Sequence, residues 1–155
     1  MSASLQHELK QSRPFPTLEE EALLSIQRTA AVLGRALGDV LKPYELSAAQ
    51  YNVLRILRGA GEPGLCRYEV GDRLVTPVPD VTRLIDRLEA RSLVARTRDE
   101  VDRRQSRARI TDNGLRLLEQ LDAEIQQRQK AFLGHVQAED LRRLIDLLAA
   151  ARTAI

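Results

Sequence analysis

The sequence predicts a mainly α-helical fold that contains one small two-stranded β-hairpin. Apolar residues recur at steps of three and four along most of the 155-residue chain, which is the spacing of one buried helix face. Capping residues and prolines stand where several of these segments begin. Only residues 93–111 depart from this pattern, with two short runs of arginine and small or branched side chains that favour a hairpin.

Length and composition indicate one globular unit that folds in water. Hydrophobic residues make up 43% of the chain and charged residues 30%, which is too apolar for a disordered chain and too charged for a membrane protein. With no stretch long enough to span a bilayer and no secretion signal at the N-terminus, we expect a cytoplasmic protein without a membrane partner. One cysteine and two distant histidines argue against a metal site, and no cofactor is expected.

The N-terminal part divides into an arm and a long helix. Residues 1–16 are expected to form a flexible arm, because the prolines near its end disfavour a helix before Thr17. Thr17 can cap a helix in segment 17–43, which ends before Pro43. The apolar seam of this helix needs a partner and consists of Leu23, Ile26, Ala30, Leu33 and Leu37.

Two short helices follow. Ser47 and Gln50 have the form of a capping box, and the helix that they begin ends in the glycine-rich segment 59–64. Residues 66–74 form a third, brief helix, which Gly71 should weaken by roughly 1 kcal/mol relative to alanine.

A fourth helix is predicted to begin at Thr76, whose hydroxyl can cap it, with proline at the next position, where the missing N–H has no intrahelical partner to lose. It runs to about Arg91. Its inward face consists of Val81, Leu84, Ile85 and Leu88. The outward face consists of Pro79, Thr82, Arg83, Asp86 and Arg87.

The predicted hairpin is followed by two more helices. Residues 93–98 and 107–111 are its strands, and the charged residues 99–106 form its tip. Thr111 can cap the next helix, and the last helix follows Gly134.

Basic charge gathers in the middle of the chain and is almost entirely arginine. Lysine supplies only 3 of the 24 basic residues, and residues 47–110 hold 13 basic against 9 acidic side chains. Arginine suits phosphates and guanine edges, so this excess favours a polyanion, with a solvated charged loop as the alternative. The five aromatic residues are scattered, which argues against stacking on single-stranded bases.

Three short helices followed by a hairpin make a winged helix-turn-helix, whose last helix lies in the major groove of DNA. Several landmarks make this arrangement more specific. They are Leu46-Ser47 with Gln50-Tyr51, Val81-Thr82-Arg83-Leu84-Ile85-Asp86-Arg87-Leu88-Glu89 followed by Leu93-Val94, and Asp99, Asp102-Arg103-Arg104 and Ile110-Thr111 with Gly114. With these residues the chain resembles the multiple antibiotic resistance regulator (MarR) family of bacterial transcription factors.

The resemblance implies a homodimer. Within a single unit over residues 17–155, segments 17–43 and 112–155 would be the dimerisation helices, and residues 44–111 the DNA-binding lobe. Two recognition helices would then enter successive major grooves of an inverted repeat, about 34–36 Å apart. We expect a ligand-responsive repressor whose partners are double-stranded DNA, a second copy of the chain and a small-molecule effector that prefers a dimer with another spacing.

The predicted DNA contacts come from the fourth helix and the hairpin. Arg83 would reach a base edge or phosphate, with a surface ion pair to Asp80 or Asp86 as the alternative. The family pattern Asp-x-Arg implies that Asp102 orients the hairpin while Arg104 enters a narrow minor groove. The full set of expected DNA-binding residues is Pro79, Thr82, Arg83, Arg103, Arg104 and Arg107. Arg87 is expected to brace the hairpin through an acidic neighbour.

Three further residues carry open alternatives. Cys66 is either a redox-sensitive thiol at a helix start or a small buried apolar residue. Tyr44 and Tyr51 either line the ligand cleft that the resemblance implies or belong to the core.

Two rival functions remain. A winged-helix module that binds another protein, and not DNA, would use the same exposed helix face. An enzyme is not expected, because the chain has no GxSxG motif, no glycine-rich phosphate loop and no paired histidines.

Overall fold

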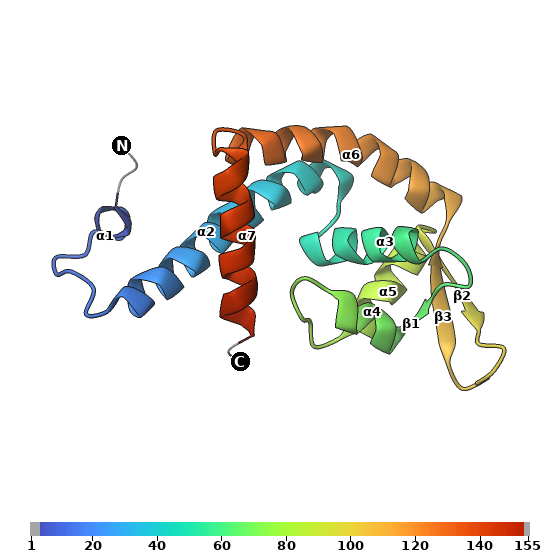
Figure 1. Cartoon of the computed structure of the whole chain (residues 1–155). Helices are drawn as coiled ribbons and strands as arrows, with labels where there is room; N and C mark the ends of the chain where they lie inside the picture. The colour runs from blue at the N-terminus through green and yellow to red at the C-terminus, as the bar shows by residue number, and fades with distance from the viewer. Residues whose placement is uncertain (1–3, 154–155) are drawn as a thin grey trace.

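The computed structural model of the chain describes residues 4–153, and its fold is mainly helical, as predicted (Figure 1). The elements in order are α1 (Leu5–Glu8), α2 (Leu18–Leu41), the 3₁₀ helix η1 (Lys42–Tyr44), α3 (Ala48–Ala60), β1 (Leu65–Cys66), α4 (Arg67–Arg73), α5 (Val81–Ala90), β2 (Val94–Arg98), β3 (Ser106–Ile110), α6 (Asp112–Leu133) and α7 (Ala138–Arg152). Among the described helices, none is both long and apolar enough to cross a membrane.

The elements divide into a lobe and a group of long helices. Helices α3, α4 and α5 gather with the three strands at the right of Figure 1, and we call this part, residues 44–111, the winged lobe. Helices α2 and α6 pack against each other and extend away from the lobe, and α7 follows at the far end of α6 (Figure 1).

The hydrophobic core lies where the long helices meet the winged lobe. Helices α2, α3, α5 and α6 each contribute leucines that are fully buried there: Leu41, Leu54, Leu57, Leu88, Leu118 and Leu121. Burying an aliphatic side chain of this size stabilises a fold by about 1.5–3 kcal/mol. The core therefore holds the lobe to the inner ends of α2 and α6, whereas α7 contributes no buried residue.

Helix caps stand where the sequence predicts most of them. Thr17 accepts a hydrogen bond from the backbone N–H of Glu20 at 3.2 Å. The capping box of α3 has both bonds, because the Gln50 N–H donates to the Ser47 hydroxyl at 3.1 Å and the Ser47 N–H donates to the Gln50 side chain at 2.9 Å. Thr111 caps α6 and also donates to the carbonyl of Ser92 at 2.7 Å.

The sheet has three strands in the order β1-β3-β2, rather than the two of a simple hairpin. Strands β2 and β3 pair as predicted, from Val94 opposite Ile110 to Arg98 opposite Ser106. The additional strand β1 places Leu65 opposite Ala108, on the other side of β3. A strand of two residues is too short to show an alternating pattern, so the sequence could not predict it.

One predicted helix start is wrong, and one short helix lies in a segment where none was predicted. Helix α5 begins at Val81 rather than after Thr76, and its cap is Asp80, which accepts from the Arg83 N–H at 2.8 Å. The residue before a proline disfavours helical backbone angles, so Pro79 delays the start. Segment 1–16 holds the short helix α1, which precedes its prolines, with Ser4 as its cap. Residues 1–3 of the expected arm lie outside the described part.

Candidate nucleic-acid interface

The outward face of α5 is exposed and carries two arginines, Arg83 and Arg87, whose side chains have no partner among residues 4–153. Thr82, Arg83, Asp86 and Arg87 are all exposed, as predicted. Among residues 4–153, the Arg83 guanidinium has no ion pair or hydrogen bond, so the expected alternative of a pair with Asp80 or Asp86 is not formed. Its five donors are available to an external acceptor.

Arg96 of β2 braces the wing against α5. Its Nε donates to Glu89 at 2.9 Å, and its Nη2 binds Glu89 at 2.6 Å and also contacts Asp86. The hydrogen bond to Glu89 is the main cause that raises the pKa of Arg96. We expected Arg87 in this role, but within the described chain Arg87 forms no ion pair. Asp86 and Glu89 are three residues apart and share the helix side that β2 covers.

Asp99 organises the tip of the wing. One carboxylate oxygen accepts from the N–H groups of Val101 at 2.8 Å and Asp102 at 2.9 Å, and the other accepts from Arg107 at 2.9 Å. These bonds lower the pKa of Asp99 from 3.8 to about 2, chiefly through the N–H of Asp102. The sequence signal for this role is an aspartate whose side chain can bond the backbone two and three residues on.

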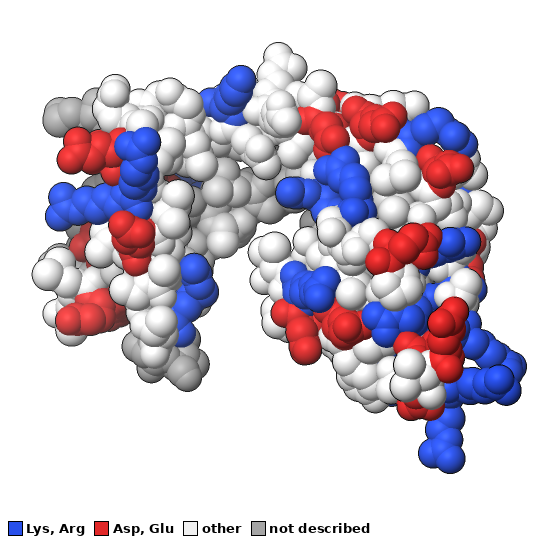
Figure 2. Space-filling model, turned by 45° about the vertical axis from the view of Figure 1, so that its right-hand side comes forward, with Lys and Arg blue, Asp and Glu red and all other residues white. Residues whose placement is uncertain are grey.

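Asp102 holds the second half of the tip. Its carboxylate accepts from the Arg104 N–H at 3.0 Å and from the Gln105 side chain at 3.2 Å. In Figure 2 basic side chains project beyond the body of the molecule at the wing end, on the lower right. The guanidinium groups of Arg103 and Arg104 make no hydrogen bond within the described chain, so the tip presents two free charges.

Arg107 is engaged within the lobe, and Pro79 lies before the start of α5. Arg107 donates to the Gly64 carbonyl at 2.8 Å, to Asp99 at 2.9 Å and to Glu69 at 3.1 Å, and only 22% of its side chain is exposed. These bonds engage its guanidinium within the lobe, where it braces the wing, and its contact to DNA stays a prediction. Pro79 is exposed, but it precedes α5 instead of standing on the outward face of that helix.

Tyr51 and Cys66 are buried, and Tyr44 is partly buried against the core. Tyr51 is 6% exposed and packs in the core, with the Arg55 guanidinium 5.9 Å from its ring centroid. Tyr44 donates to Glu124 at 3.3 Å. An apolar hollow between α2 and α6 is lined by neither tyrosine, but by Leu33, Leu37, Val40, Ile125, Arg128, Gln129, Phe132 and Leu133. Cys66 is buried at the start of α4. Its redox role stays a prediction.

Comparison with known proteins identifies the architecture. A MarR transcription factor from Planctomyces limnophilus has 40% sequence identity to the chain and a TM-score of 0.68, over 88% of this chain and 99% of that one. The chain belongs to the MarR family. The model of the MarR family also matches residues 44–105, which cover most of the winged lobe. The resemblance and the winged helix-turn-helix predicted from the sequence are thereby confirmed.

Two further MarR-type relatives extend the comparison. The HTH-type transcriptional regulator TtmR of Methylorubrum extorquens (strain PA1) is 36% identical over 106 residues, which are 68% of this chain and 53% of that protein. The match thus spans about half the length of TtmR. The PcaV transcriptional regulator from Streptomyces coelicolor, solved in complex with its natural ligand, is 26% identical with a TM-score of 0.71, over 92% of this chain and 97% of that one. The expected class, a transcription regulator, is confirmed by these relatives.

Proposed function

We propose that this MarR-family chain regulates transcription as a homodimer that binds an inverted repeat in duplex DNA. Helix α5 would lie in the major groove and the wing would reach the neighbouring minor groove. The observation that carries the proposal is the free guanidinium of Arg83 on the exposed face of α5, beside a wing whose backbone is preset by Asp99 and Asp102. Binding, and not catalysis, would be the activity, and it would be exercised in the cytoplasm.

The long helices support the homodimer. Helix α7 exposes Leu144, Ile145 and Leu147 at 43%, 63% and 60%, and α2 exposes Leu23 at 56%. Apolar side chains in such a row stabilise an assembly when a second copy covers them. A two-fold axis through this contact would present two winged lobes to DNA, as an inverted repeat requires.

A small-molecule effector completes the proposal. PcaV, with its natural ligand, has the same fold at 26% identity. An effector that binds better to a dimer with another spacing of its lobes would weaken DNA binding, because a ligand shifts an equilibrium only through differential affinity. We therefore propose a repressor that releases its operator when the effector is present.

The first test measures binding of duplex DNA against salt concentration. Wild-type affinity should fall steeply with salt, since each neutralised phosphate adds about 0.9 to the log–log slope. Arg83→Ala should weaken operator binding by about 1–3 kcal/mol and relax base preference at one position of each half-site. Arg55→Ala, which removes the same charge from α3, is the matched control and should bind like wild type.

Footprinting across genomic DNA supplies the operator for this comparison. Recovered sites that share an inverted repeat support the homodimer on DNA. If no duplex binds in dilute salt, DNA binding is excluded and a winged-helix module for protein contacts becomes the better description.

A further inference from the structure

A hollow of about 490 Å³ opens on the surface of the winged lobe between the wing, α4 and α5, and its α4 wall has no role described above. Its walls come from all three elements and from the sheet beneath. The lining residues are Cys66, Arg67, Tyr68, Thr82, Ile85, Arg96, Arg104, Gln105, Ser106 and Ala108. One helix face and one side of the wing tip therefore share a single concave surface.

On the α4 side, the wall is a stacked pair of side chains. The Arg67 guanidinium lies 4.4 Å from the centroid of the Tyr68 ring and donates to the Tyr68 hydroxyl oxygen. Because that oxygen accepts from Arg67, the hydroxyl hydrogen of Tyr68 can point away toward another acceptor. Tyr68 is 60% exposed, although a tyrosine ring is largely apolar. The stack therefore places the Arg67 guanidinium and the Tyr68 hydroxyl donor side by side at the edge of the hollow.

The hollow selects for an anion through the sign of its lining. Arg67 of α4 and Arg104 of the wing tip both line it, together with hydroxyl and amide groups, and no carboxylate is part of the lining. Arg96 also lines it, but its charge is matched by Asp86 and Glu89. A smaller neighbouring hollow shares Arg67 and Tyr68 and contains Asp72 and Asp80 as well, so an anion is favoured on the wing side.

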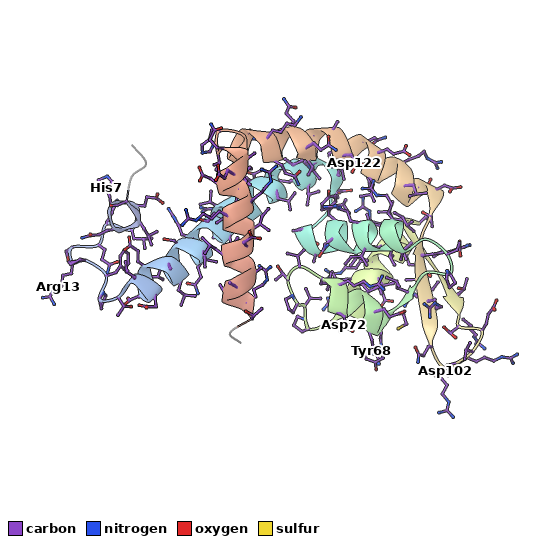
Figure 3. The ribbon with its side chains drawn as sticks, viewed as in Figure 1. His7, Arg13, Tyr68, Asp72, Asp102 and Asp122 are labelled. Atoms are coloured by element: carbon purple, nitrogen blue, oxygen red, sulfur yellow. The ribbon has the colours of Figure 1, made fainter. Side chains whose placement is uncertain are left out.

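The position of the hollow indicates which anion it takes. In Figure 3, Tyr68 and Asp102 of the wing tip project from the same lower side of the lobe, whereas Asp122 lies on the opposite side. If α5 lies in the major groove and the wing in the adjacent minor groove, the sugar-phosphate strand that separates these grooves must cross the surface between them. The hollow occupies that surface.

We propose that this hollow holds the sugar-phosphate strand, with Arg67 and Tyr68 as contacts to its phosphates in addition to those of the wing. The inference rests on the proposed function and adds two positioning contacts that the sequence analysis did not identify. Phosphate contacts set the register of a protein on DNA without reading sequence. Arg67 and Tyr68 therefore contribute to affinity equally on every duplex.

The test compares Arg67→Ala with Arg55→Ala on two duplexes: a footprinted operator, and a mixed-sequence duplex of roughly 40 base pairs, long enough for two half-sites. Arg55 makes a matched control, because it also stands over a tyrosine ring and lies near Asp122, on the side away from the hollow. Arg67→Ala should weaken both complexes by a similar factor, about tenfold at low salt, and reduce the salt slope by about 0.9 for each half-site. Arg55→Ala should change neither value.

Two more variants separate charge from geometry. Arg67→Lys keeps the charge and should keep the wild-type salt slope. Tyr68→Phe keeps the ring and loses the donor, so it should weaken binding a few-fold at every salt concentration without changing the slope. Thermal unfolding of each variant shows whether the fold is intact.

The results distinguish this inference from the function on which it rests. If wild type binds duplex DNA while Arg67→Ala keeps its affinity and slope, the hollow does not hold the strand, and the proposed function stands. If Arg67→Ala loses affinity for the operator alone, Arg67 contacts a base instead of a phosphate, and the inference is also overturned. If wild type binds no duplex, both proposals fall together.

Discussion

Single arginines of the wing differ in whether their charge is available to a partner. In the sequence, Arg103, Arg104 and Arg107 belong to one run and carry equal weight as DNA contacts. In the structure, Arg107 is engaged by acceptors at positions 64, 69 and 99, while the other two extend from the tip. The sequence could predict that these arginines lie together at the wing. It could not predict which guanidinium is left without a partner, because the acceptors that engage Arg107 come from distant parts of the chain.

The acid dependence of the wing should follow from Asp99. Its folded-state pKa of about 2 lies below the usual 3.8, so its contribution to stability is fully present above about pH 4 and is lost as the pH falls toward 2. Asp99→Asn should therefore unfold at lower urea concentration than wild type at neutral pH, and the difference should shrink on acidification. Urea unfolding across this pH range measures it.

Glu100→Gln serves as the control, because Glu100 is a neighbouring carboxylate without such hydrogen bonds inside the described chain. A difference between Asp99→Asn and wild type that stays constant down to pH 2 would show that the carboxylate charge is not what orders the tip.

At the scale of elements, local sequence predicts where helices begin better than it predicts where they end or which strands pair. Thr17, Ser47 and Thr111 cap helices as their sequence context indicates, since a cap depends only on the next three residues. Strand β1 could not be foreseen, because two residues become a strand only through β3. The start of α5 was misplaced because Thr76 and Asp80 both have the chemistry of a cap, and Pro79 decides between them.

Gly64, directly before β1, should be highly sensitive to substitution. Its φ is +88°, and a Cβ there would lie 2.3 Å from the carbonyl oxygen of Ala108 on β3. Gly64→Ala should destabilise the protein by roughly 1–3 kcal/mol or more, through backbone strain and separation of β1 from β3. Gly59→Ala in α3, where a Cβ meets nothing within 4 Å, should leave stability unchanged or raise it by up to about 1 kcal/mol. Urea titration of both variants decides whether the close approach at Gly64 matters.

For the whole molecule, the long helices on either side of the winged lobe were predictable from their apolar seams. The pairing of these helices in a dimer stays a prediction. The apolar hollow between α2 and α6 was not predictable: Tyr51, one of the two tyrosines expected at a cleft, packs in the core, and neither tyrosine lines the hollow. The periodicity of apolar residues predicts which side chains are buried, but it does not predict which of them line a cavity.

Ile145 tests the pairing. It is 63% exposed on α7, a helix that buries none of its described residues within one chain. Ile145→Asp should keep the helical content of wild type, shift sedimentation from dimer to monomer, and weaken operator binding because the two lobes are no longer linked. A variant that sediments as a dimer with unchanged affinity would place the pairing surface elsewhere.

Arg91, directly after α5, links that helix to the segment that follows α2. Its guanidinium donates to the carbonyls of Glu45 at 2.8 Å and Tyr44 at 3.0 Å, just where the chain leaves the long helix for α3. Because these bonds link α5 to the segment that follows α2, a rotation of α2 would carry α5 with it. In the proposed dimer, a small change in the angle of the long helices would therefore alter the distance between the two copies of α5.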